Sequence, residues 1–219
     1  MSSRLSFGEF KKALEDPNLK NGLMTKVWGP SGWLFLHCVT FGYPLNPEQF
    51  DKDNKQKRGT TRRHYKNFLM ELGWVFPCKY CRISYRKFIK YIPIGSVERA
   101  LKNLSLQAIK NKNFGTYRRE LLEFCTKCFR GGGRSHPSFL DSRELLCYWL
   151  YLIHNLVNDK LGVPECDRPS FFSVQRKYEQ FRAKCSPTTP AERLKNYQSG
   201  CVIPANGRKK RCLIKIVDA

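Results

Sequence analysis

The spacing of apolar and polar positions predicts helices along most of this 219-residue chain. From Tyr65 to Val75, apolar side chains recur every three or four residues and form one stripe, which ends before Pro77. An earlier helix is expected from Pro30, a residue suited to the first helical position, to about Phe41. Strand patterns are sparse, so the sequence predicts an all-α fold.

The longest apolar segment predicts the central helix of a bundle. It extends to Leu161 from Asp141, whose side chain can cap the helix and which fits a capping box with Glu144. Its apolar residues occupy most sides, as in a helix surrounded by other helices. Further helices are expected at residues 6–16, 78–91 and 170–185, and at two places between 96 and 130, the second being 116–130.

Proline and glycine interrupt these patterns between residues 186 and 212. We therefore expect a helix and lead-in over residues 1–27, one helical domain over 28–185, and a flexible tail over 186–219, where 213–217 either form a short strand or stay mobile. Apolar residues make up 41% of the chain, enough for a hydrophobic core. No run approaches the roughly 20 apolar residues of a membrane helix, and no secretory signal is recognisable, so neither membrane insertion nor secretion is expected.

The chain is strongly basic, with 40 Lys and Arg against 18 Asp and Glu, a net charge of +22. This charge predicts attraction to polyanions or to acidic proteins. The basic residues are spread along the chain without a recognised nucleic-acid-reading motif, so nucleic-acid binding remains possible but is not required. Their densest stretch, residues 52–66, is expected to be an exposed loop and the start of a helix.

Ten cysteines are more than an inert intracellular protein carries, which indicates redox or metal chemistry. Two pairs have CxxC spacing, Cys78/Cys81 and Cys125/Cys128. Cys78 is expected at a helix start, where the helix dipole and the neighbouring Lys79 favour the thiolate and lower the cysteine pKa. We expect Cys78 to be the more accessible of the two and Cys81 to face the interior. The alternative is that the two pairs share a zinc ion, although the long segment between them is unusual for such a site.

Two histidines lie far apart in the sequence on apolar helices. His37 is one turn after Trp33, and His154 is one turn before Asn158. Each alone is compatible with an ordinary buried histidine. Together with a dithiol between them, they indicate a flat aromatic cofactor, such as an isoalloxazine or adenine ring, which offers stacking surface and hydrogen-bonding edges.

Three motifs resemble the Erv/ALR family of FAD-dependent sulfhydryl oxidases. They are Gly29, Trp33, Leu36-His37 and Tyr43-Pro44; Pro77 to Cys81; and His154-Asn-x-Val-Asn-x-Lys-Leu-Gly162. The resemblance covers about residues 28–91 and 138–180. The run from Cys81 to Phe88 is most similar to members from large DNA viruses.

The resemblance implies a bundle of four to five core helices that binds FAD. A substrate thiolate would attack Cys78 and release Cys81 as the thiolate that reduces FAD, from which oxygen takes the electrons as hydrogen peroxide. It also implies protein dithiol substrates, a homodimer, and a location in the host cytoplasm at the virus assembly site, either alone or together with the virion. The FAD-binding positions implied are Gly29, Trp33, His37, Tyr43, Cys81, His154, Asn155, Asn158 and Lys160.

The chain departs from the family pattern in three ways. Pro30 stands where cellular members often have Arg, and Lys90 and Tyr151 stand where they have a structural disulfide. An inserted helical segment at about 93–135 carries the Cys125/Cys128 pair, which is either a shuttle between substrate and Cys78 or a structural bridge. The cysteines near the end of the chain are the less favoured alternative for the shuttle: Cys185, Cys201 and Cys212. Two rival functions remain: a zinc-stabilised nucleic-acid-binding protein, and a catalytically silent structural or virion protein with the same fold.

Overall fold

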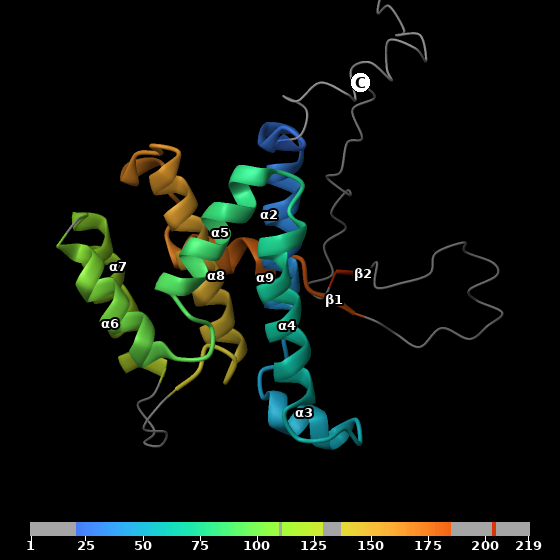
Figure 1. Cartoon of the computed structure of the whole chain (residues 1–219). Helices are drawn as coiled ribbons and strands as arrows, with labels where there is room; N and C mark the ends of the chain where they lie inside the picture. Colours follow the sequence, from blue (N-terminus) through green and yellow to red (C-terminus); the bar gives the residue numbers. More distant parts are fainter. Residues whose placement is uncertain (1–20, 110, 129–136, 185–202, 205–219) are drawn as a thin grey trace, which may run out of the picture. The chain divides into compact units, whose positions relative to one another are not determined.

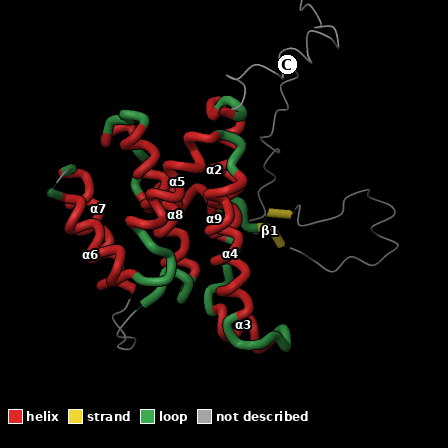
Figure 2. Tube along the Cα trace, viewed as in Figure 1, coloured by secondary structure: helices red, strands yellow, loops and turns green. Residues whose placement is uncertain are grey.

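The structure, a computed structural model, describes residues 21–109, 111–128, 137–184 and 203–204. Helices make up nearly all of the regular structure (Figure 2), which confirms the all-α prediction. The chain forms two compact units, residues 1–168 and 169–219. None of the helices in the described ranges combines the length and hydropathy that crossing a bilayer requires.

The first unit holds seven α-helices and a 3-10 turn within its described residues (Figure 1). They are α2 (Thr25–Phe41), α3 (Pro47–Asp53), α4 (Thr60–Val75), α5 (Lys79–Tyr91), α6 (Val97–Ala108), α7 (Lys112–Cys128), α8 (Arg143–Lys160) and η2 (Glu165–Asp167). The second unit holds α9 (Phe171–Glu179) and a short antiparallel pair of strands, β1 (Ala183–Lys184) and β2 (Ile203–Pro204).

Helix α8 is the centre of the first unit, as its sequence predicts. Helices α2 and α5 both pack against it, α4 packs against α5, and α6 pairs with α7. Trp149 on α8 is fully buried, and its indole Nε1 donates a hydrogen bond of 2.8 Å to the carbonyl of Ile92. The predicted cap is wrong by one residue, because Ser142 accepts the bond from the Leu145 amide, while Asp141 instead pairs with Arg62.

Helix α2 begins five residues before the predicted start at Pro30, which lies inside the helix. The start is set by a tertiary contact: the Leu23 amide donates to the Pro77 carbonyl at 2.9 Å and holds Met24 in the extended conformation of an N-cap. A proline within a helix lacks one N–H donor, which α2 tolerates. Helix α7 begins at Lys112 rather than Thr116.

Helix α3 was not predicted; it comes before the basic stretch of residues 52–66 and overlaps that stretch only at its last two residues. The Asn46 side chain caps it by accepting from the Glu48 and Gln49 amides. Asp51 is buried at its end and accepts from the Gly59 and Thr61 amides and the Thr61 hydroxyl, which joins α3 to α4.

The remaining expectations concern the two ends of the chain. Helix α9 ends at Glu179, earlier than the predicted 185, because the chain continues as β1. The helix expected at 6–16, the residues 213–217 for which a short strand or a mobile segment was expected, and most of the expected tail lie outside the described residues.

Candidate functional site

The Cys78/Cys81 pair lies at the amino-terminal end of α5, beside the amino-terminal end of α2 (Figure 1). Cys78 is the N-cap, and its Sγ accepts a hydrogen bond from the Cys81 amide at 3.4 Å. Gly22 forms a β-bridge with Cys78 and covers it, so only 8% of Cys78 is exposed, whereas Cys81 is partly exposed. The prediction that Cys78 is the more accessible sulfur is therefore wrong, since a segment distant in sequence shields it.

The surroundings of the two thiols separate their acidities. Burial opposes ionisation of Cys78, but hydrogen bonds from Cys81 and Thr25 outweigh it and lower the Cys78 pKa, in the predicted direction. Burial and the neighbouring Cys78 raise the pKa of Cys81. The Thr25 hydroxyl lies 3.3 Å from Cys81 Sγ, within hydrogen-bond distance. Cys78 is thus the sulfur that ionises first.

We expect Thr25→Val to weaken this activation of Cys78. Valine has nearly the same shape as threonine but donates no hydrogen bond, so the thiolate loses a partner. Alkylation of Cys78 at pH 7 should slow by about fivefold. The alkylation rate is measured by treating the reduced protein with iodoacetamide and following the Cys78 peptide by mass spectrometry. Thr25→Ser keeps the hydroxyl and should react like the wild type; equal slowing in both variants would contradict the role of the hydroxyl.

A cavity of about 270 Å³ lies beside Cys81, between α2, α5 and α8. Its wall is largely apolar and includes Trp28 and Trp33 from α2 and Phe76 before the dithiol. The Trp28 ring lies over Gly32, where an added Cβ would come within 3.2 Å of it. An apolar cavity with a sulfur and a few polar groups in its wall has the composition of a site for a flat organic ligand.

The two histidine segments meet, as their sequence patterns indicated. The rings of Trp33 and His154 are stacked, with centroids 3.8 Å apart and planes 8° from parallel. His37 Nε2 lies 3.2 Å from His154 Nδ1, so one of these nitrogens donates to the other. Burial lowers the His154 pKa to about 4, which keeps this imidazole neutral at neutral pH.

The neutral His154 should make the protein lose stability in mild acid. Below pH 6.5 the unfolded chain protonates this histidine, but the folded state resists protonation until about pH 4. The unfolded state therefore binds more protons in that window, and the free energy of unfolding should fall by about 2 kcal/mol as pH drops through it. Urea unfolding at pH 7.0, 5.5 and 4.5 measures this.

His154→Phe is the control for the acid effect. Phenylalanine retains a flat ring for Trp33 but cannot bind a proton, so its unfolding free energy should depend less on pH. The same pH slope in both proteins would assign the acid sensitivity to other groups.

Not every residue implied by the resemblance reaches the cavity. Gly29, Trp33, Cys81 and Lys160 lie in its wall. His37, His154, Asn155 and Asn158 lie outside that wall, although His154 stacks on Trp33 and Asn158 Nδ2 donates to Asn155 Oδ1 at 3.4 Å.

The structure does not bring Tyr43 to the cavity. This tyrosine follows the carboxyl end of α2, is fully buried, and donates its hydroxyl to the Leu140 carbonyl at 2.8 Å. Its ring contacts Tyr65 edge to face, with centroids 4.6 Å apart. Both its hydroxyl and its ring are therefore used inside the bundle.

Sequence reasoning gave no role to Thr25 and Trp28, both in the cavity wall. Trp28 Nε1 is buried and has no hydrogen-bond acceptor among the described residues. A buried indole N–H without an acceptor indicates a ligand that supplies one. The spacing from Thr25 through Trp28 and Gly32 to Leu36 places these residues on one helical face, a signal that could have revealed them.

The second CxxC pair lies elsewhere. Cys125 is close enough to Tyr148 to raise the tyrosine pKa, and Glu144 is close enough to Cys128 to raise the cysteine pKa; Glu144 and Tyr148 both lie near the start of α8. Cys81, by contrast, lies near Lys160 at the end of α8. These positions are separated by about 18 Å of helix axis. Burial raises the pKa of Cys125 to about 12. The two pairs therefore do not share a zinc ion within this fold, and direct exchange between them in one chain gains no support.

Comparison with known proteins adds one relative. A probable FAD-linked sulfhydryl oxidase of Acanthamoeba polyphaga mimivirus is 36% identical over 67 residues. The match covers 31% of this chain and 40% of the length of that relative. No protein-family profile matches the chain. Over this stretch the chain is thus similar to a viral protein named for flavin-linked thiol oxidation.

Proposed function

We propose that the protein is an FAD-linked thiol oxidase that forms disulfides in protein substrates. The observation that carries the proposal is the place of Cys81. Cys81 and Cys78 both lie in the wall of an apolar cavity that also contains two tryptophans, and the sulfur of Cys78, the more acidic of the two, accepts a hydrogen bond from the Cys81 amide. The similarity to the viral sulfhydryl oxidase supports the same chemistry.

The cavity residues fit FAD. Trp28 Nε1 is a buried donor available to an acceptor on the cofactor, Trp33 provides an aromatic face, and Gly29 and Gly32 leave room for a ring. The Lys160 ammonium donates to the Ser84 hydroxyl at the cavity edge, where it also favours the Cys81 thiolate. When bound, FAD would supply the two-electron oxidation that re-forms the Cys78–Cys81 disulfide and would pass the electrons to oxygen.

The residues of the chain then carry out thiol–disulfide exchange. A substrate thiolate attacks Cys78 Sγ, a substrate–Cys78 disulfide forms, the Cys78–Cys81 bond breaks, and Cys81 leaves as a thiolate. The second substrate thiolate attacks the substrate sulfur of that mixed disulfide and releases Cys78 as a thiolate. The substrate has lost two electrons and two protons, and both cysteines are reduced. The lowered pKa of Cys78 makes it a good leaving group in this second step.

The visible spectrum of the purified protein tests the proposal, followed by oxygen uptake with dithiothreitol. We expect flavin absorption and uptake that yields hydrogen peroxide. A colourless protein that contains zinc would favour the nucleic-acid-binding alternative. Flavin absorption without oxygen uptake would favour the catalytically silent structural protein.

The proposal includes a homodimer that covers exposed apolar side chains of α2 and α4. Phe35 and Phe68 are both exposed, and their rings meet edge to face with centroids 6.2 Å apart. Exposed contiguous apolar surface of this kind is typical of an interface. Light scattering should give the mass of two chains, and Phe35→Glu should give the mass of one. A wild-type mass of one chain would contradict the dimer.

A further inference from the structure

The charges near the dithiol are unevenly distributed. Helix α5, whose N-cap is Cys78, contains five Lys and Arg residues and no acidic residue, and Lys26 is the one charged residue of α2. Residues 137–168, by contrast, contain five acidic and three basic residues. The helix that carries the dithiol is thus basic throughout, while other basic segments, such as residues 52–66, lie elsewhere in the chain.

Four residues of α5 form one exposed stripe, which we name the α5 lysine face: Lys79, Ile83, Lys87 and Lys90. Their spacing of four, four and three residues places them on one side of the helix. The stripe begins next to Cys78 and runs away from it along α5. Around its beginning the side chains of Leu23, Met24 and Tyr80 are more than half exposed.

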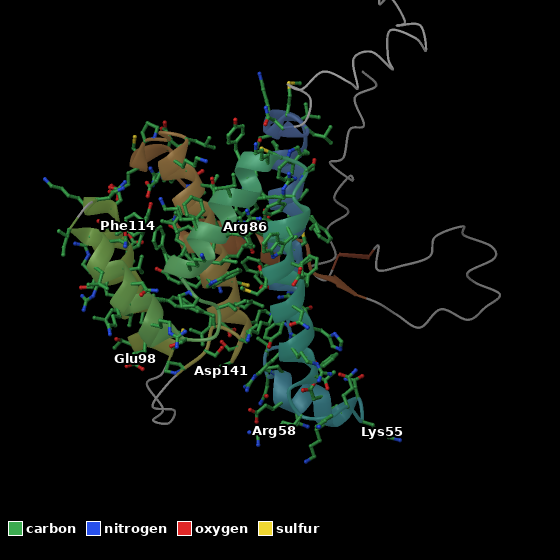
Figure 3. All side chains as sticks on the ribbon, in the orientation of Figure 1. Lys55, Arg58, Arg86, Glu98, Phe114 and Asp141 are labelled. Carbon is green, nitrogen blue, oxygen red and sulfur yellow. The ribbon has the colours of Figure 1, made fainter. Side chains whose placement is uncertain are left out.

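The arginines of α5 are already engaged, which bears on the kind of partner. Arg82 donates to the Phe76 carbonyl at 2.6 Å, and Arg86, labelled in Figure 3, donates to the Gly73 carbonyl at 2.9 Å and lies over the Trp74 ring. Recognition of phosphate typically uses such guanidinium forks. The lysines that remain outward are point charges that attract carboxylates without a strict geometry.

We infer that the α5 lysine face docks acidic segments of protein substrates and so selects cysteines followed or preceded by Asp and Glu. This inference rests on the proposed oxidase function and names its substrate class. Lys87 and Lys90 lie about 13 and 18 Å along α5 from Cys78. An extended peptide covers these distances in about four to six residues. The acidic side chains of a substrate should therefore lie four to six positions from the cysteine that reacts with Cys78.

Three peptides that differ only at those positions test the inference. Each contains a reduced dithiol, with Glu, Gln or Lys four to six positions away, and oxygen uptake of the flavin-loaded full chain gives kcat/KM. At low salt we expect the Glu peptide to exceed the Gln peptide by about tenfold and the Lys peptide to be slowest. Added salt should remove the difference. Equal values for the three peptides would overturn the inference.

A charge-reversed pair identifies the surface responsible. Lys87→Glu with Lys90→Glu should lower kcat/KM for the Glu peptide by about tenfold and leave dithiothreitol oxidation unchanged. Lys52→Glu with Lys57→Glu is the matched control, since it makes the same charge change beyond the start of α4, about 24 Å from the dithiol end of that helix. An equal loss of kcat/KM in the two double variants would show that net charge alone causes the effect and would overturn the inference.

Binding without turnover separates this inference from the proposed function. Fluorescence anisotropy of a labelled Glu peptide with serines in place of its cysteines should show binding that Lys87→Glu with Lys90→Glu weakens. If that binding is observed while the wild type does not oxidise dithiothreitol, the oxidase proposal fails and the docking surface stands. Tighter binding of a labelled single-stranded oligonucleotide that depends on the same lysines would assign the α5 lysine face to nucleic acid instead.

Discussion

Cys81→Ser is expected to abolish dithiothreitol-dependent oxygen uptake, with a loss of at least about 10³-fold, because a hydroxyl cannot form or break a disulfide. Cys78→Ser should cause a similar loss for a different reason, since it removes the sulfur that substrate attacks in the proposed mechanism. Serine is close in size to cysteine, so the cavity beside Cys81 should persist and flavin absorption should remain. Oxygen uptake and the visible spectrum measure the two effects separately.

An aromatic disulfide distinguishes the roles of the two sulfurs. In Cys81→Ser, the Cys78 thiolate attacks the reagent, keeps one aromatic thiol as a stable mixed disulfide and releases the other. In the reduced wild type, Cys81 displaces the second thiol and closes the Cys78–Cys81 bond. Mass spectrometry should therefore find the adduct on Cys78 only in the variant. The exposed Cys166 provides the control, because Cys166→Ser should retain full activity; persistent turnover in Cys81→Ser would assign the chemistry to another cysteine.

Gly22→Ala is expected to release the segment that covers the dithiol. Gly22 has a φ of 91°, and an added Cβ would lie 1.8 Å from the Pro77 carbonyl oxygen. A side chain in the left-handed region costs about 1–2 kcal/mol, and relief of the contact requires the backbone to move. Together these costs of about 3 kcal/mol exceed the roughly 1 kcal/mol of the bond from the Leu23 amide to the Pro77 carbonyl. The segment should therefore detach rather than adapt.

Detachment of the segment at Gly22 should accelerate hydrogen exchange and slow thiol oxidation. Hydrogen exchange at the Leu23 amide should accelerate by about 100-fold, and thiol oxidation should fall by about tenfold, since Thr25 leaves the two sulfurs. Gly59→Ala is the matched control: Gly59 also has a positive φ, of 84°, but an added Cβ meets nothing within 4 Å. It should lower stability by about 1 kcal/mol and spare turnover. Equal loss of turnover in both variants would contradict the role given to the Gly22 segment.

Local patterns in the sequence were sufficient for most of the helices. The stripe before Pro77 is α4, the apolar segment after Asp141 is α8, and the Cys78 pair starts α5. These features follow from spacing and from capping residues a few positions apart. Helix α3 was missed although Asn46 and Pro47 provide a cap and a first-turn proline, because its seven residues are too few for an apolar stripe to stand out.

Contacts between segments distant in sequence decided the surroundings of the dithiol and the position of Tyr43. Thr25 and Gly22 acquire their roles from Cys81 and Pro77, more than 50 positions away, and no periodicity near residue 22 indicates that approach. Tyr43 follows the motif of α2 but packs inside the bundle, because the face of a helix that meets a cavity depends on its neighbours.

The sequence by itself determined the helical fold, the position of the Cys78/Cys81 pair at a helix start and the placement of Trp33 and His37 one turn apart on one helix, since each depends on helical spacing or on residue chemistry. Only the tertiary structure decided which sulfur is covered, which residues surround the cavity and where the second cysteine pair lies. The physical reason is that burial, hydrogen bonding and pKa depend on the atoms that surround a group, and folding brings those atoms from remote parts of the chain.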